Sequence, residues 1–498
     1  MIRALNDGDP VVVRTLLEAG GRLEHGRVDG YDSLIDAVHG RDVLRDPRLL
    51  DLLALLVANK VPLNGISSYG ESGLRVLSRL GRFDAVKFLL DAGADPAHLR
   101  WTPLMHAVAT GTAADVDQLL RDGAALEEID WWERTAWLIA LQSGDLAKCK
   151  LLRDHGANIQ ACGRCRKPPL HYPIDSHHPH VLRWLIELGL DIEHADEFGT
   201  TPLIEAAEYD DLDCVEILLA AGASIEHEHN GSAALGHTRS AAIMRRLLAA
   251  GANPKDLSHE SRRALLGLPV DPNASLLQVS ADDFRRGRTR HYGSANPERM
   301  EEPFWQAMIQ AGINAYQAAQ LCGGDSGKNK APVWCAQRFG QSMTFLPDGR
   351  IVLVGGEHED SYDPDFCIYN DVFVRELDGT FTIFGYPESS FPPTDFHTAT
   401  LVGEHLYLIG SLGYYGARGF GETPVYRLDT GTFAIERLHV SGNSPGWIYD
   451  HRADLIASRK IRVTGGKVAT LIDGEEVHTD NERRFVLDLD RLAWRFAT

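Results

Sequence analysis

The sequence contains neither a long apolar run nor a regular set of cysteines. No stretch of about 18 apolar residues exists, so we expect no membrane-spanning helix, and the first residues do not form a secretory signal. The seven cysteines are an odd number without a disulfide-type spacing. They predict reduced thiols in a cytoplasmic protein.

Positive charge is also scarce. The 498 residues hold 50 Lys and Arg against 70 Asp and Glu, a net charge of −20. Such a chain repels phosphate backbones, so we expect no nucleic-acid partner. The run Arg285–Arg290 is a local exception, with four arginines in six residues. We interpret it as a solvated linker or as an internal contact with an acidic part of the chain.

The first half of the chain contains a repeat. Leu104, Trp137, Leu170 and Leu203 follow one another at a constant interval. A glycine ends each unit, and these glycines recur at nearly the same interval, at Gly93, Gly123, Gly156, Gly189, Gly222 and Gly251. Self-similarity at a fixed period of a few tens of residues is typical of a solenoid.

Each unit has the features of two helices followed by a hairpin. A Thr-Pro pair, as at Thr201-Pro202, can cap and begin a first helix. Paired apolar residues, as at Leu218-Leu219, form the buried stripe of a second helix, and the glycine after it suits a left-handed cap. This pattern resembles the ankyrin repeat. The resemblance covers residues 1–258 with about eight repeats, and implies a concave surface that binds a protein partner.

The register of the repeat places candidate partner-binding residues at the hairpin tips. Trp131 and Trp132 are adjacent there, and Trp and Arg are frequent hot spots of interfaces. One of the two tryptophans could instead pack on the neighbouring hairpin, in which case we expect the other to remain exposed. The candidate residues are His98, Leu99, Trp131, Trp132, Arg164, Glu197 and Phe198.

One short segment of this region has the ligand types of a zinc site. It holds Cys162 and Cys165, followed by His171, His177, His178 and His180. The register places the cysteines on a hairpin and the last three histidines beyond the next helix, roughly 10 Å away. We therefore predict no metal site.

Residues 269–332 interrupt the repeat. Asn296-Pro297-Glu298 is expected to begin one amphipathic helix that continues to Leu321. The glycine- and lysine-rich stretch 323–330 follows that helix and lacks the spacing of a phosphate-binding loop. We therefore predict no cofactor.

From Val333 onward the pattern alternates with period two, which predicts strands. Gly355, Gly410 and Gly465 recur at equal intervals, and each follows a pair of expected strands. A period of about 50 residues with a glycine after the second strand resembles the blades of a kelch propeller. Because three blades do not close a ring, the alternatives are an open wedge against the middle segment, an assembly of two chains, or a β-sandwich.

Two loops of this region carry most of its chemistry. The loop 357–365 is acidic, and the loop 413–421 contains Tyr414 and Tyr415, two further candidate partner-binding residues. A candidate small-molecule site consists of His358, Asp360, Asp363, His397 and His451. The histidines would act as acid or base and the carboxylates would bind a cation. No nucleophile elbow is found, so catalysis is the alternative and no catalytic residue is assigned.

The sequence thus predicts a multidomain α + β protein. An N-terminal ankyrin α-solenoid (1–268) is followed by a linker with one amphipathic helix (269–332) and an all-β C-terminal region with about three kelch-like blades (333–498). We expect an adaptor or regulator that binds a protein partner through the concave face and hairpin tips, with a homodimer through the β region as an option. The alternatives are an enzyme with a small-molecule site on the loops of the β region, or a solenoid that shields a neighbouring protein.

Overall fold

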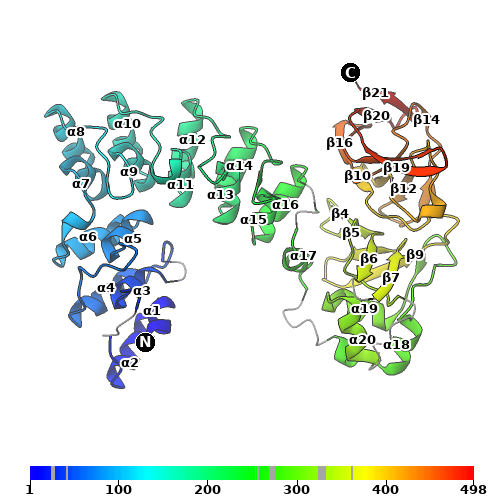
Figure 1. Cartoon of the computed structure of the whole chain (residues 1–498), viewed down its shortest axis with the longest axis horizontal. Helices are drawn as coiled ribbons and strands as arrows, with labels where there is room; N and C mark the ends of the chain where they lie inside the picture. Colours follow the sequence, from blue (N-terminus) through cyan, green and yellow to red (C-terminus); the bar gives the residue numbers. More distant parts are fainter. Residues whose placement is uncertain are drawn as a thin grey trace. The chain divides into compact units, whose positions relative to one another are not determined.

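The computed structural model describes residues 1–23, 28–40, 43–252, 254, 257–268, 275–323, 332–360 and 363–497. The chain forms two compact units, Met1–Ala252 and Asn253–Thr498 (Figure 1). The first unit is helical and the second is rich in β-strands. The glycine- and lysine-rich stretch 324–330 lies outside the described residues.

The helices of the first unit follow one another in pairs (Figure 1). They are α1 (Ile2–Asn6), α2 (Pro10–Glu18), α3 (Ser33–Val38), α4 (Leu49–Ala58), α5 (Gly73–Arg79), α6 (Phe83–Asp91), α7 (Pro103–Thr110), α8 (Ala113–Arg121), α9 (Ala136–Ser143), α10 (Leu146–Asp154), α11 (His171–Asp175), α12 (Pro179–Glu187), α13 (Pro202–Glu208), α14 (Leu212–Ala220), α15 (Ala234–His237) and α16 (Ala241–Ala249). The short strands β1 (Glu228–His229) and β2 (Ser232–Ala233) form a hairpin before α15.

The helix ends are made by the residues that the repeat pattern singles out. The side chain of Thr201 accepts a hydrogen bond from the Ile204 N–H, with Pro202 at the first helical position. Gly123 ends α8 with φ +81°, in the left-handed region that favours glycine. The N–H of Ala124 then donates to the Leu119 carbonyl at 3.0 Å, which satisfies a carbonyl at the helix end.

The first helices of successive pairs pack side by side, with one interruption. α3 packs along α5, and α7, α9, α11, α13 and α15 each pack along the next, whereas α5 and α7 have little contact. The connection between Gly93 and Thr102 explains the break, because it is shorter than in later repeats and contains a 3-10 turn, η1 (Pro96–His98), in place of a projecting hairpin. We call α1–α6 the first stack and α7–α16 the second stack (Figure 1).

The second unit begins with helices. They are α17 (His259–Leu266), η4 (Leu276–Gln278), α18 (Ala281–Gly287), α19 (Pro303–Ala311) and α20 (Ala315–Gly323), with β3 (Glu298–Arg299) between α18 and α19. The sequence placed α17 at the end of the solenoid, but its Leu266 carbonyl accepts a hydrogen bond from Arg375 in the second unit at 2.7 Å. The single helix expected from residue 297 is two helices, because Gly312 ends α19 with φ +57°.

Three antiparallel sheets of the same strand order follow. The first sheet contains β4 (Ser342–Phe345), β5 (Ile351–Val354), β8 (Val372–Arg375) and β9 (Phe381–Gly385). The second sheet contains β10 (Thr398–Val402), β11 (His405–Ile409), β12 (Val425–Asp429) and β13 (Ile435–Arg437). The third sheet contains β16 (Arg452–Ala457), β17 (Lys460–Thr464), β20 (Phe485–Asp488) and β21 (Ala493–Phe496). At their outer edges, β3 pairs antiparallel with β9, and β14 (Ser441–Gly442) pairs in parallel with β21. The remaining strands are the hairpin β6 (Glu357–Asp360)–β7 (Asp363–Ile368) and the small sheet of β15 (Trp447–Tyr449), β18 (Lys467–Ile472) and β19 (Glu475–Asp480).

The sheets pack face to face through two apolar cores. Val354 and Leu408 belong to the core between the first and second sheets, and Ile409 and Ile461 to the core between the second and third. The far side of the first sheet is covered by Trp334, whose ring lies 5.6 Å from Phe373 and stacks on Trp305 of α19 at 4.7 Å. No closed barrel or propeller is seen in the described residues, so the kelch-like arrangement stays a prediction.

The outer face of the third sheet is charged. Arg462 and Arg452 both pair with Asp454, at 3.1 and 2.9 Å, and Arg495 pairs with Asp488 at 2.7 Å. These side chains alternate with Ile461, Val463 and Phe485, which face the core. A polar outer face allows the stack of sheets to end in water without a further sheet.

The glycines that recur in the strand pattern let neighbouring sheets approach each other. A Cβ atom at Gly355 would lie 2.1 Å from the Thr394 carbonyl oxygen, and one at Gly410 would lie 2.3 Å from the Ile448 carbonyl oxygen. The next residues, Gly356 and Ser411, donate their N–H groups to the same two carbonyls at 2.8 and 3.0 Å. Backbone contact between sheets therefore requires glycine at these two positions, whereas a Cβ atom at the third repeated glycine, Gly465, would meet nothing within 4 Å.

Candidate protein-binding site

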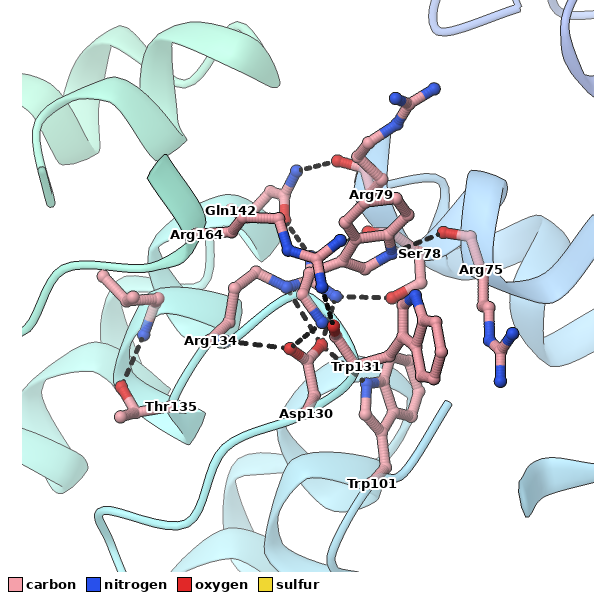
Figure 2. A network of polar contacts seen from close by, with 12 residues as sticks. Arg75, Ser78, Arg79, Trp101, Asp130, Trp131, Arg134, Thr135, Gln142 and Arg164 are labelled. Atoms are coloured by element: carbon pink, nitrogen blue, oxygen red, sulfur yellow. Dashed lines mark hydrogen bonds and ion pairs between the residues drawn. The ribbon is translucent and has the colours of Figure 1, made fainter. Parts of the chain in front are cut away.

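A buried ion pair lies beneath the hairpin that carries the two tryptophans. The Arg134 Nη2 and Asp130 Oδ2 atoms are 2.6 Å apart, and the two side chains are only 3% and 1% exposed. Asp130 also accepts hydrogen bonds from the N–H groups of Trp132 and Arg134, both at 2.8 Å, and from the Trp101 Nε1 at 3.3 Å (Figure 2). The carboxylate thereby fixes the conformation of the whole hairpin.

The same arginine connects the two stacks. Its Nη1 donates to the Ser78 carbonyl at 2.8 Å, and its Nη2 donates to the Ser78 hydroxyl (Figure 2). Gln142 of α9 donates from Nε2 to the Arg79 carbonyl at 2.7 Å. Ser78 and Arg79 are the last residues of α5, so side chains of the second stack donate hydrogen bonds to carbonyls at the C-terminal end of this helix.

Trp131 and Trp132 lie against the arginines of α5. The Arg75 guanidinium is 3.5 Å from the ring centre of Trp131, and the Trp132 Nε1 donates to the Arg75 carbonyl at 2.8 Å. Arg79 and Arg164 lie 5.3 and 5.0 Å from the ring of Trp132, within the range of cation–π attraction. Both tryptophans are half-buried. The expectation that one of them would be exposed is therefore wrong, because α5 covers both.

The other candidate residues of the solenoid differ in exposure. Phe198 is 63% exposed, and Glu197 and Arg164 are also exposed. His98 is half-buried, and Leu99 is only 1% exposed, so the Leu99 side chain does not reach solvent. The hairpin tips are joined by backbone hydrogen bonds, from Arg164 N–H to the Trp132 carbonyl at 3.2 Å and from Glu197 N–H to the Cys165 carbonyl at 3.0 Å.

In the second unit, Tyr414 and Tyr415 are neighbours with different surroundings. The Tyr414 hydroxyl accepts hydrogen bonds from the Ile368 N–H at 2.8 Å and from Arg290 at 3.2 Å, whereas Tyr415 is 66% exposed. Arg290 belongs to the basic run, and Arg285 and Arg286 of that run pair with Asp282 and Asp283.

The five residues of the candidate small-molecule site fall into two groups. His358, Asp360 and Asp363 belong to the β6–β7 hairpin, where Asp360 and Asp363 are opposite each other and His358 is buried. The Asp360 and Asp363 side chains lie outside the described residues. His397 and His451 are buried between the sheets, with Nε2 atoms 2.8 Å from the Ser342 hydroxyl and 3.0 Å from the Thr398 hydroxyl. The two histidines thus connect the innermost strands of successive sheets.

The burial of these two histidines predicts a loss of stability in acid. Desolvation lowers the pKa of His397 to about 4, and desolvation together with the charge of His397 lowers the pKa of His451 to about 3. Because both groups take up a proton on unfolding below their ordinary pKa of 6.5, the free energy of unfolding should be highest above pH 6.5. It should fall by about 1.4 kcal/mol per pH unit for each imidazole as the pH drops toward 4.

The measurement is a series of urea unfolding curves of the second unit between pH 7.5 and 4.5. His397→Gln and His451→Gln should each flatten the pH dependence, while replacement of the exposed His439 of the same unit should leave it unchanged. An unchanged slope in both glutamine variants would show that the acid sensitivity has another source.

The cysteines and histidines of the rejected zinc site bind separate partners. His171 pairs with Glu205, His177 lies 2.8 Å from Asp211, and the His180 Nε2 lies 2.9 Å from the Gly144 carbonyl oxygen. Cys162 is exposed on the hairpin. In the part of the chain that the structure describes, no three His, Cys, Asp or Glu side chains are placed to hold a metal ion.

A family model described as ankyrin repeats, in three copies, matches residues 74–162 and 137–229. Residues 74–229 consist of ankyrin repeats. They include both tryptophans, the buried ion pair and the exposed Phe198. None of the described helices is long and apolar enough to cross a membrane.

Several known proteins match a part of the chain. The chain is 30% identical over 161 residues to the ankyrin repeat protein nuc-2 of Neurospora crassa, which is 31% of this chain and 15% of that protein. It is 35% identical over 98 residues to glycerophosphocholine phosphodiesterase gde1 of Schizosaccharomyces pombe, which is 19% of this chain and 9% of that protein. It is 32% identical over 78 residues to human ankyrin repeat domain-containing protein 37, which is 16% of this chain and 49% of that protein. The chain thus spans less than half the length of each relative.

Among solved structures, the ankyrin repeat domain of Bcl-3, described as a unique member of the IkappaB protein family, is similar at 27% sequence identity. The matched region covers 37% of this chain and 88% of the Bcl-3 chain, with a TM-score of 0.29.

The sequence reasoning missed Arg75, Arg79, Asp130, Arg134 and Gln142, which surround the tryptophans. One signal was available for them. The interval between Gly93 and Gly123 is shorter than the interval between the glycines of the three repeats that follow, and it marks the shortened connection at which the two stacks meet.

Proposed function

We propose that this chain is a cytoplasmic adaptor or regulator whose ankyrin solenoid binds a protein partner through its hairpin tips and concave face. Ankyrin repeats indicate a role in protein–protein interaction, and the rest of the proposal is an inference from the surface. The observation that carries it is the group of aromatic and arginine side chains at neighbouring tips. Arg164 is exposed at the tip next to that of Trp131 and Trp132, and Phe198 is exposed at the following tip. Such side chains dominate the binding energy of many interfaces.

The β-rich region is proposed as a second binding module, with three kelch-like blades and the exposed Tyr415 on one of its loops. The alternative enzyme is not favoured by any contact of the described residues, because His397 and His451 are buried and bonded to neighbouring strands. A homodimer through the β region stays a prediction.

Affinity capture from native lysate tests the proposal. The full-length protein is compared with a Phe198→Ala/Arg164→Ala variant, and retained proteins are quantified by mass spectrometry. We expect at least one partner to fall by about tenfold or more, the effect of losing about 1.4 kcal/mol of binding free energy. The matched control is Val11→Ala, since Val11 is 70% exposed on α2, away from the tips. A set of retained proteins that is identical for both variants would refute binding through the tips.

A further inference from the structure

α5 covers the two tryptophans of the surface that the solenoid is proposed to use. Its two arginines, Arg75 and Arg79, lie four residues apart and contact the two adjacent indoles. Its last carbonyls accept hydrogen bonds from Arg134 and Gln142. The second stack thereby contacts one short basic helix in two ways, through cation–π attraction to its arginines and through donors to its carboxyl end.

Further contacts hold the first stack in this position. A Cβ atom at Gly81, just after α5, would lie 2.5 Å from the Ser176 hydroxyl oxygen and 2.9 Å from the Gln142 Cγ. Arg45, from the connection between α3 and α4, donates from Nε to the His177 Nε2 and from Nη2 to the Tyr209 carbonyl, both at 2.8 Å. Arg45 and Tyr209 are 164 residues apart in the sequence. The first stack therefore lies over the second stack from the tryptophans as far as α13.

The connection between the stacks allows them to separate. α5 and α7 have little contact, so the stacks are joined by residues 93–102, by a contact between α6 and α7, and by the side-chain bonds described above. Three of these bonds end on the backbone carbonyls of Ser78, Arg79 and Tyr209. Such polar contacts contribute little net stability each, because water replaces them when the surface opens.

We propose that α5 is an internal ligand, which occupies the site where the second stack binds a basic helical segment of its partner. The inference rests on the proposed function. The partner segment is a short helix with two basic residues four positions apart. This helix ends within one turn after the second basic residue. The second stack is acidic as a whole, since residues 103–252 hold 23 acidic and 12 basic side chains, a net charge of −11. Binding of the partner requires the first stack to leave.

The probe that tests this is a fluorescein-labelled peptide of residues 70–82, which contains α5. It is titrated into three forms of the full-length protein, followed by fluorescence anisotropy. The first is the natural chain. The second is Ser176→Tyr, which places a ring where Gly81 lies and removes no hydrogen bond of Ser176 among the described residues. The third is Gly81→Cys/Ser176→Cys, in which a disulfide holds the stacks together.

We expect Ser176→Tyr to bind the peptide at least tenfold more tightly than the natural chain. The oxidised disulfide form should not bind it, and should recover natural binding when reduced. A peptide with both arginines replaced by glutamate should lose binding to every form. The single Gly81→Cys variant controls for strain, because Gly81 has φ +72°, and Arg45→Ala/Gln142→Ala is a second opening variant should Ser176→Tyr fold poorly.

A difference of less than threefold among the three forms, including no binding to any of them, would overturn the proposal. This outcome is separate from failure of the proposed function, because the peptide assay uses no partner. If capture depends on Phe198 and Arg164 but the peptide does not distinguish the three forms, α5 is an ordinary structural helix and the proposed function stands. If the peptide distinguishes the forms but capture does not depend on Phe198 and Arg164, binding through the exposed tips fails and the role of α5 stands.

Discussion

Replacing Arg134 with alanine is expected to lower the free energy of unfolding of the ankyrin unit by about 3–5 kcal/mol. The change leaves the Asp130 carboxylate buried at 1% exposure without its counter-charge, and the Ser78 carbonyl without its donor from the second stack. Removing one partner of a buried ion pair costs far more than the pair itself contributes, because the remaining charge is unsolvated. The loss is a large fraction of the stability of an ordinary domain.

Urea unfolding followed by circular dichroism measures this effect as a shift of the transition midpoint. Arg153→Ala is the matched control, since Arg153 and Asp154 form an ion pair at 2.6 Å with 34% and 59% exposed side chains. Exposed pairs of this kind contribute about 1 kcal/mol or less. Equal shifts in the two variants would show that Arg134 and Asp130 are not a buried pair in solution.

Replacing Arg338 with methionine is expected to destabilise the β-rich unit by a similar amount, about 3–5 kcal/mol. Arg338 is fully buried, forms an ion pair with Asp371, and donates a second hydrogen bond to it from Nη2 at 3.1 Å. Its guanidinium also lies 3.5 Å from the ring centre of Tyr369. Methionine keeps apolar volume at this position but leaves the carboxylate unpaired.

A double variant separates the charge from the packing in this case. Arg338→Met/Asp371→Asn should recover most of the lost stability, because asparagine is neutral and still accepts the hydrogen bond that Trp334 donates to position 371 at 3.0 Å. Arg437→Ala, which breaks an exposed pair with Glu422, is the surface control. A double variant as unstable as Arg338→Met would attribute the loss to packing of the guanidinium and contradict the electrostatic explanation.

The repeat of the first unit could be predicted from the sequence because its determinants are local. A threonine cap, a proline at the first turn and a glycine after the second helix act within a few residues of one another, and Thr201, Pro202 and Gly123 have the predicted conformations. The β-strands after Val333 were predicted for the same reason. The strand order behind their alternation recurs in all three sheets, and the close backbone contact at the repeated glycine recurs in the first two, at Gly355 and Gly410.

The surroundings of the tryptophans could not be predicted in this way. Arg134 and Ser78 are 56 residues apart in the sequence, and Trp132 and Arg75 are 57 apart. Their contact depends on the break between α5 and α7, which a regular repeat does not contain. His397 and His451 were recognised as equivalent positions, but their burial between sheets follows from packing, which residue type alone does not reveal.

The central claim is that the hairpin tips of the solenoid are the surface that contacts the partner. Site-specific photo-crosslinking in cells tests it most directly, with a photoreactive phenylalanine at position 198, 415 or 11, which are 63%, 66% and 70% exposed in the natural chain. We expect a discrete crosslinked protein from position 198 and none from position 11, while position 415 reports on the second module. Crosslinks from position 11 equal to those from position 198, or a partner captured only from position 415, would contradict it.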